Sequence, residues 1–305
     1  MSAGRRRALR SGWLATGWLL ATCTAAGAQD RESAAPPAVD LQRLAAWLRQ
    51  PPADPALLAA AATGHLPAGG LLRAALTAED MDAECAEVHV GCVDAWANEL
   101  ERLPGDPPAR AAAALKLLHQ RVLKHYDAGA SSLAGALSEG RYNCLGSVIL
   151  FVALAERLGM PCRAVERPGH VLVRLNLERG WIDIETTSAR GVGLPQTPGA
   201  APAAERELSN RALLALLYFN RGCDLLERRA FRAALAANLA ALELDPANAR
   251  ARNNLLAAWN NWALALARQG ELRAAGALLS RGLELAPGYP LFAENMQAIA
   301  AIPEQ

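Results

Sequence analysis

Asn143-Cys144-Leu145-Gly146 opens an almost wholly apolar stretch that runs to Leu158. Two further segments follow it, Gly169-His170-Val171 and Trp181-Ile182-Asp183-Ile184-Glu185-Thr186-Thr187. The apolar stretch predicts a buried helix, and the later segments have the composition of strands. The order of cysteine, histidine and acid is the one that a thiol nucleophile, its base and the base's orienting group require. The sequence therefore predicts an α+β core, a helix packed on a small antiparallel sheet.

The predicted core covers residues 131–200. Gly159 and Pro161 predict the end of the buried helix, because glycine commonly closes a helix and proline cannot continue one. Beyond them, turn residues at Pro168-Gly169 and Glu178-Arg179-Gly180 separate three expected strands. These strands are expected at 162–166, 170–177 and 181–187.

Cys144, His170 and one acid are the candidate catalytic residues of this core. The aligned peptide dipoles and free N–H groups of a helix start favour a thiolate and can stabilise an oxyanion. His170 begins a strand after a tight turn, so its ring can face the helix end. Asp183 and Glu185 are two residues apart on one strand and therefore share a face. Either carboxylate could orient the imidazole, and strand geometry leaves the choice open.

The chain before the core is expected to be helical. Residues 29–39 are predicted to be a flexible lead, and residues 40–130 a helical layer that covers the core. After the core, the Gly-, Pro- and Ala-rich residues 188–206 predict a linker or surface loop. Within the helical layer we expect helices at 40–49, 55–62, 69–76 and 109–125, and one longer helix or two over 79–102.

The C-terminal region, residues 209–303, contains an internal repeat. Leu242-Glu243-Leu244-Asp245-Pro246 returns as Leu283-Glu284-Leu285-Ala286-Pro287. Counting back from each proline aligns small and large residues in the pattern of a tetratricopeptide repeat. The prolines lie farther apart than one repeat length, which predicts additional residues in the region 248–256. The aligned pairs are Tyr218 with Trp259, Gly222 with Ala263, Leu225 with Leu266, Ala234 with Ala275, and Ala241 with Gly282.

The core segments, with Gly140-Arg141-Tyr142 before Cys144, resemble the transglutaminase-like superfamily, a papain-related cysteine fold found in many exported bacterial proteins. Some of those proteins carry tetratricopeptide repeats. The resemblance covers about 60 residues and implies that Cys144 is the nucleophile and His170 the base. The family's acid, usually an aspartate before a Pro-Thr pair, falls on Glu185, where this chain has Glu-Thr-Thr. That departure keeps Asp183 as the alternative acid, and the family's upstream oxyanion residue has no match.

Residues 1–28 are predicted to be a signal peptide. Four arginines precede the short apolar stretch 13–22, and Ala26-Gly27-Ala28 has the small residues of a cleavage site. We therefore expect an exported protein of the periplasm or cell envelope. Leu20-Ala21-Thr22-Cys23 resembles a lipobox, so a lipid anchor at Cys23 is an alternative to a soluble product. No later segment is apolar for long enough to predict a membrane span.

Composition indicates a globular chain, with 52% hydrophobic and 20% charged residues in 305. Signal cleavage would remove four arginines and no acid, leaving 27 basic and 30 acidic residues, and nucleic acid is not an expected partner. Cys85 and Cys92 are the expected disulfide in an oxidising compartment. Two free thiols, or metal ligation together with His89, are the alternatives, and we predict no metal or cofactor.

These features predict a cysteine enzyme that acts on protein or peptide amides. In this hypothesis Cys144 attacks the carbonyl, His170 takes its proton, Glu185 holds the imidazole, and a thioester forms. Water would then give hydrolysis and an amine would give transamidation. The repeats would bind the protein substrate or partner through their concave face. The alternative is a non-catalytic transglutaminase-like module that serves in protein binding or assembly.

Overall fold

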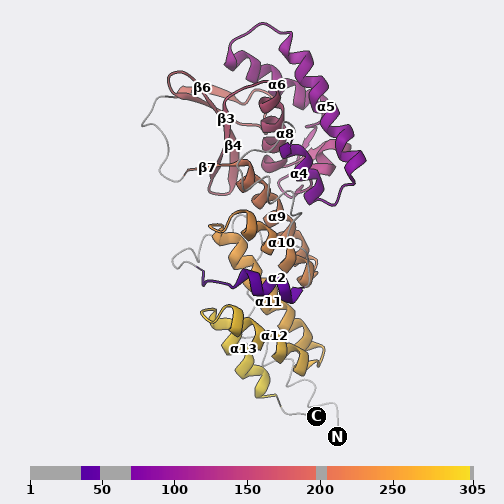
Figure 1. The fold of residues 1–305 in the computed structure, drawn as a ribbon, viewed down its shortest axis with the longest axis vertical. Helices are drawn as coiled ribbons and strands as arrows, with labels where there is room; N and C mark the ends of the chain where they lie inside the picture. The colour runs from indigo at the N-terminus through magenta and orange to yellow at the C-terminus, as the bar shows by residue number, and fades with distance from the viewer. Residues whose placement is uncertain (1–35, 49–69, 197–204, 303–305) are drawn as a thin grey trace. The chain divides into compact units, whose positions relative to one another are not determined.

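The computed structural model describes residues 36–48, 70–196 and 205–302 (Figure 1). In these ranges the chain forms an α+β arrangement in which helices pack against a small sheet, followed by helical hairpins. The helices are α2 (Leu41–Leu48), α4 (Gly70–Ala78), α5 (Ala83–Glu101), α6 (Pro107–Arg121), α7 (Leu133–Glu139), α8 (Cys144–Arg157), α9 (Asn210–Glu227), α10 (Phe231–Leu244), α11 (Ala249–Arg268), α12 (Leu272–Leu285) and α13 (Pro290–Ala300). The strands are β1 (His125–Tyr126), β2 (Arg141–Tyr142), β3 (Cys162–Arg167), β4 (His170–Asn176), β5 (Trp181–Ile184), β6 (Val192–Gln196) and β7 (Arg206–Leu208).

Five strands form one antiparallel sheet in the order β6-β5-β4-β3-β7. Gly169 makes the β3–β4 turn and Gly180 the β4–β5 turn, each with a positive φ that glycine adopts without strain. The β4–β5 register places Val173 opposite Ile184. The start of β4 and the residue that follows β5 consequently lie at the same end of the sheet, which brings His170 and Glu185 together.

The buried helix α8 packs against β3 and β4, and helices α4, α5 and α6 pack against α8. All residues of α8 from Leu145 to Ala155 are buried. The predicted helix on a small antiparallel sheet is confirmed. Leu158 caps the helix and Gly159 follows it with a left-handed φ of 62°, as the glycine and proline signals predicted.

The prediction of a linker or loop over 188–206 is wrong in part. β6 lies inside that range and β7 begins at its end, and these two strands form the outer edges of the sheet. The sequence around them is rich in proline and glycine, which sheet edges tolerate and central strands do not. Neither α7 nor the short parallel pairing between β1 and β2 was predicted from the sequence.

The C-terminal region consists of two helical hairpins, α9–α10 and α11–α12, followed by α13. The region 248–256, where additional residues were expected, forms the cap and first turns of the 20-residue helix α11. Gly282 allows the Phe292 ring to approach α12, since a Cβ at that position would meet the ring at 2.8 Å. The helix that follows the second hairpin therefore closes the apolar core of this region.

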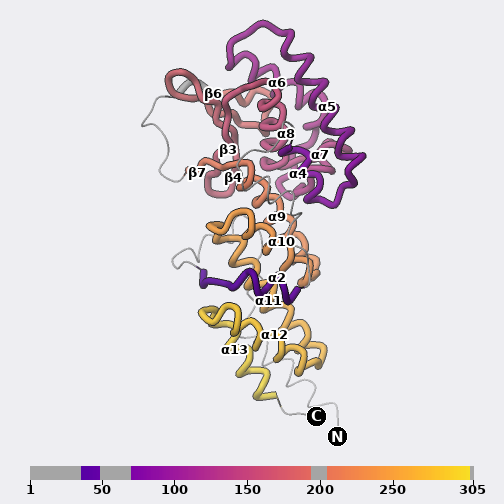
Figure 2. The backbone as a smooth tube through the Cα atoms, viewed as in Figure 1, coloured from indigo at the N-terminus to yellow at the C-terminus, as the bar shows by residue number. Residues whose placement is uncertain are grey.

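The predicted N-terminal layer divides into two parts. Helices α4, α5 and α6 lie in the layer over α8, as expected, but α2 packs on α10 and α12. In Figure 2 the indigo tube of α2 crosses between these helices. Trp47 stacks on Trp259 with ring centroids 5.1 Å apart, and Leu44 and Leu48 are buried beside them. The helix expected at 55–62 falls outside the described residues.

Cys85 and Cys92 are both free and exposed, so the predicted disulfide is wrong. Both lie on α5, seven residues apart, which separates their Cα atoms by roughly 10 Å along the axis, too far for a disulfide. Among the described residues no group of three or more His, Cys, Asp or Glu side chains could hold a metal ion. Within the same ranges, no helix has the length and apolar character needed to cross a bilayer.

Candidate active site

Cys144 is the first residue of α8, and its surroundings follow from the helix start. Asn143 caps the helix, because its side-chain oxygen accepts a hydrogen bond of 2.9 Å from the Gly146 N–H. The thiol is partly exposed, while the cap is 6% exposed. The fold therefore presents a cysteine at the positive end of a buried helix and leaves it accessible to small molecules.

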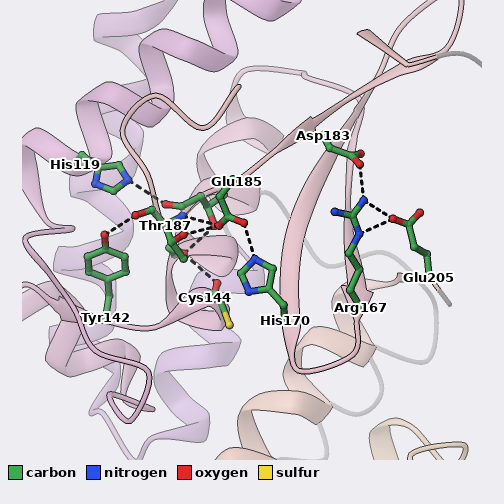
Figure 3. A network of polar contacts seen from close by, with 11 residues as sticks. His119, Tyr142, Cys144, Arg167, His170, Asp183, Glu185, Thr187 and Glu205 are labelled. Carbon is green, nitrogen blue, oxygen red and sulfur yellow. Dashed lines mark hydrogen bonds and ion pairs between the residues drawn. The ribbon is translucent and has the colours of Figure 1, made fainter. Parts of the chain in front are cut away.

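His170 lies between Cys144 and Glu185 (Figure 3). Its Nε2 is 2.6 Å from Glu185 Oε2. The ring also interacts with the Cys144 thiol, and Figure 3 shows the sulfur on the ring side opposite the carboxylate. The three predicted residues are consequently brought together in the order nucleophile, imidazole and acid.

The charges of this group reinforce one another. The hydrogen bond with Cys144 and then that with Glu185 raise the pKa of His170 to about 10, against the opposing effect of burial. For Glu185, burial favours the neutral acid, but hydrogen bonds from His170 and Thr187 outweigh it and lower the pKa to about 2. His170 is therefore an imidazolium at neutral pH, with both ring nitrogens available as donors.

Asp183, the alternative acid, contacts arginines and not His170. Its carboxylate accepts hydrogen bonds of 2.7 and 3.0 Å from Arg174 and one of 2.8 Å from Arg167. Arg174 also pairs with Glu205 and lies 4.7 Å above the Trp181 ring. Figure 3 shows Asp183 and Arg167 at a distance from the thiol. Among the two candidate acids, Glu185 is the one in contact with the imidazole.

Glu185 is fixed by the turn that follows β5. Its Oε1 accepts hydrogen bonds from the Thr187 backbone N–H (3.1 Å) and hydroxyl (2.6 Å), which leaves Oε2 for His170. Gly191 packs against the backbone carbonyl of Glu185, since a Cβ on Gly191 would lie 1.8 Å from that carbonyl oxygen. The backbone N–H of Glu185 donates to the Gly191 carbonyl at 2.7 Å. The closed loop holds the carboxylate in one orientation.

Three further residues, which the sequence did not identify as part of the site, support this loop. The Tyr142 hydroxyl donates to the Thr187 carbonyl at 3.1 Å, and His119 Nε2 lies 3.0 Å from the Thr186 carbonyl. Ser147 Oγ lies 2.8 Å from Thr186 Oγ1. Tyr142 stands two residues before Cys144 and Ser147 three after it, a proximity that could have indicated them. His119 is 67 residues from Thr186 and has no such signal.

Tyr126 is an exposed aromatic residue beside the site. β1 pairs with β2 so that Tyr126 is opposite Tyr142, and their ring centroids are 5.8 Å apart. Burial first, and then electrostatic interactions with Cys144 and Glu185, raise the pKa of its phenol. The phenol therefore remains protonated beside the thiol at neutral pH.

The other described thiols lie in different surroundings. Cys162 begins β3, where burial raises its pKa to about 12. Cys85 lies in the first turn of α5, but a hydrogen bond with Asp82 raises its pKa. A helix start alone therefore does not produce the environment of Cys144, which also has an imidazole next to it.

No protein-family model matches the chain, and no curated protein matches it. A solved structure with distant similarity is the crystal structure of menin that reveals the binding site for Mixed Lineage Leukemia (MLL) protein. The match has a TM-score of 0.38 and 13% sequence identity, and it covers 78% of this chain and 67% of that chain. A similarity at this level assigns no family to the chain.

Proposed function

We propose that this protein is an exported, transglutaminase-like cysteine enzyme that acts on protein or peptide amides. The observation that carries the proposal is the position of His170, which lies between the Cys144 side chain and Glu185, with its Nε2 2.6 Å from Glu185 Oε2. Nucleophilic catalysis by a thiol requires an adjacent base and a group that orients the base. The β4–β5 register brings His170 and Glu185 together, and the Asn143 cap starts α8 at Cys144.

In the proposed reaction, Cys144 reacts as a thiolate beside the His170 imidazolium. Its Sγ forms a bond to the amide carbonyl carbon, and the backbone N–H groups at the start of α8 stabilise the resulting oxyanion. The C–N bond then breaks as His170 gives its proton to the leaving amine, and a thioester remains. Water or a second amine attacks the thioester, His170 accepts the proton of the attacking group, and the Cys144 thiolate leaves.

Because Nε2 of His170 faces Glu185, the other ring nitrogen, Nδ1, is the one that exchanges protons with the reacting groups. Glu185 keeps the ring in this orientation and stabilises its positive charge. The helical hairpins α9–α12 would recruit a protein substrate, because stacked hairpins offer an extended surface beside the core.

A second candidate function is a non-catalytic binding or assembly module. One observation favours it: the acid is a glutamate followed by Thr186, where the resembling family has an aspartate followed by proline. Reactivity of the thiol separates the two candidates, since a module without chemistry has no need of an activated cysteine.

The test measures alkylation of each cysteine by iodoacetamide between pH 5.5 and 9.5, followed by mass spectrometry of the peptides. We expect Cys144 to react at pH 6 at least about tenfold faster than Cys85, because only thiolates react and a paired imidazolium favours that form. Cys85 is the control for the helix position, as an exposed thiol in the first turn of a helix, although Asp82 raises its pKa, and Cys92 on the same helix is a second exposed control.

The variant His170→Gln should remove the advantage of Cys144 at pH 6 while leaving its reaction at pH 9.5 unchanged. If Cys144 of the unmodified chain reacts no faster than Cys85 at pH 6, the enzyme proposal is wrong and the binding module is favoured.

A further inference from the structure

We infer that Ser147 and Thr186 are positioning residues, which hold the nucleophile's helix and the acid's loop at a fixed spacing. The inference rests on the proposed function for its meaning in catalysis. Both side chains are completely buried, and their hydroxyl oxygens are 2.8 Å apart. Because neither side chain is exposed, their influence acts through Cys144 and Glu185.

The direction of the hydrogen bonds follows from proton counting. Ser147 Oγ lies 3.0 Å from the Cys144 carbonyl, which can only accept, so the one hydroxyl proton of Ser147 is donated there. In the contact between the two hydroxyls, Thr186 must therefore be the donor and Ser147 the acceptor. A chain of hydrogen bonds runs from Thr186 through Ser147 to the Cys144 carbonyl.

These hydrogen bonds connect the segment that carries Cys144 with the segment that carries Glu185. Thr186 follows Glu185 directly, and its carbonyl and that of Thr187 are held from the other side by His119 and Tyr142. His119 attaches the loop to α6 and Tyr142 attaches it to the end of β2, whereas the Ser147 contact attaches it to the first turn of α8. The spacing between the thiol and Glu185, which His170 must bridge, therefore depends on the two hydroxyls.

Thr186 is also the residue at which this chain departs from the resembling family, where a proline occupies the position. Proline has no side-chain hydroxyl and cannot donate to Ser147. The hydroxyl pair is thus a feature of this chain's own site, and it accompanies the longer acid Glu185.

The experiment compares Thr186→Val with Thr186→Ser in the full chain. Valine preserves the shape of threonine and removes the donor, while serine retains the donor. For Thr186→Val we expect the alkylation rate of Cys144 at pH 6 to fall about tenfold, because the thiolate–imidazolium pair becomes less favoured, with no change at pH 9.5. Thr186→Ser should stay within about twofold of the unmodified chain at both pH values.

Folding is followed in parallel by thermal unfolding. Ser147→Ala leaves the buried Thr186 hydroxyl without an acceptor, so its melting temperature should fall more than that of Ser147→Ala/Thr186→Val, which removes both partners. Ser138→Ala is the matched control, because Ser138 makes a similar hydrogen bond to a helix carbonyl, that of Ala134, on the exposed face of α7.

A second readout distinguishes this inference from the proposed function. The ¹⁵N and ¹H NMR signals of the His170 ring report its bond to Glu185 whether or not the thiol is reactive. If Thr186→Val leaves both the pH 6 rate and the His170 signals unchanged, the inference is overturned. If the valine variant shifts the His170 signals while Cys144 of the unmodified chain reacts like Cys85, the positioning role stands and the enzyme proposal fails.

Discussion

At the scale of single residues, the role of a carboxylate depends on the cation next to it. Asp183 and Glu185 are equivalent by sequence spacing, and strand alternation alone could not separate them. In the structure the two arginines Arg167 and Arg174 surround Asp183, while Glu185 lies past the end of β5 and meets His170. Arg167 lies across from His170 in the β3–β4 register, a relation that requires the sheet to be known.

Glu185→Gln and Asp183→Asn should have different effects. A glutamine cannot balance the imidazolium, so Glu185→Gln should slow Cys144 alkylation at pH 6 by about tenfold or more. Asp183→Asn leaves Arg174, only 8% exposed, with Glu205 as its remaining acid. We expect it to lower the free energy of unfolding by about 1–3 kcal/mol without changing the alkylation rate. If Asp183→Asn slowed the alkylation of Cys144 and Glu185→Gln did not, Asp183 would be the functional acid.

The stability contributed by the His170–Glu185 pair should depend on pH in a defined direction. The folded-state pKa of His170 is raised from 6.5 to about 10, so its contribution is complete below about pH 6.5 and disappears as the pH rises through 10. That of Glu185 is lowered from 4.5 to about 2, so its contribution is present above pH 4.5 and is lost as the pH falls toward 2.

The measurement is the difference in free energy of unfolding between the unmodified chain and His170→Gln from pH 6 to pH 10. We expect the difference to become smaller as the pH rises through this window. A difference that stays constant or increases would contradict a charged His170 in the folded state.

At the scale of secondary-structure elements, the sequence predicted what local chemistry determines. The apolar run after Cys144, together with Gly159 and Pro161, predicted α8, and the two glycine turns predicted the strands β3 to β5. The edge strands β6 and β7 were missed because their pairing partners, not their own composition, keep them extended.

The cap of α8 should contribute measurably to stability. Asn143→Ala removes the hydrogen bond to the Gly146 N–H and should lower the free energy of unfolding by about 1 kcal/mol, as measured by urea denaturation. Asn143→Ser retains an acceptor at the cap position and should recover most of that loss. Equal stability of the alanine and unmodified chains would show that the cap does not hold this helix.

At the scale of the whole molecule, contacts between distant parts of the sequence were the least predictable. His119 meets Thr186, and α2 packs on α10 and α12, although no motif connects these segments. Amphipathic periodicity predicted that α2 would bury one face, but it could not say which surface would receive that face. No feature of the sequence indicated that α2 would pack on the helical hairpins and not on the core.

The packing of α2 predicts a strong effect of Leu44→Ala. Leu44 is completely buried in the apolar cluster of the helical hairpins, so its truncation should cost about 2–5 kcal/mol. Because Trp47 stacks on Trp259, the change should also appear in tryptophan fluorescence during unfolding. Arg43→Ala is the control on the same helix, since Arg43 is 56% exposed, and it should change stability little.

The closed loop after β5 limits which amino acids can occupy position 191. The contact of Gly191 with the Glu185 peptide leaves no space for even a methyl group. In a library with a fully randomised codon at position 191, selection for the reactive thiol should recover glycine alone, although residue 191 itself takes no part in the chemistry. Homologous proteins that retain Glu185 in this loop should therefore also retain glycine six positions after it.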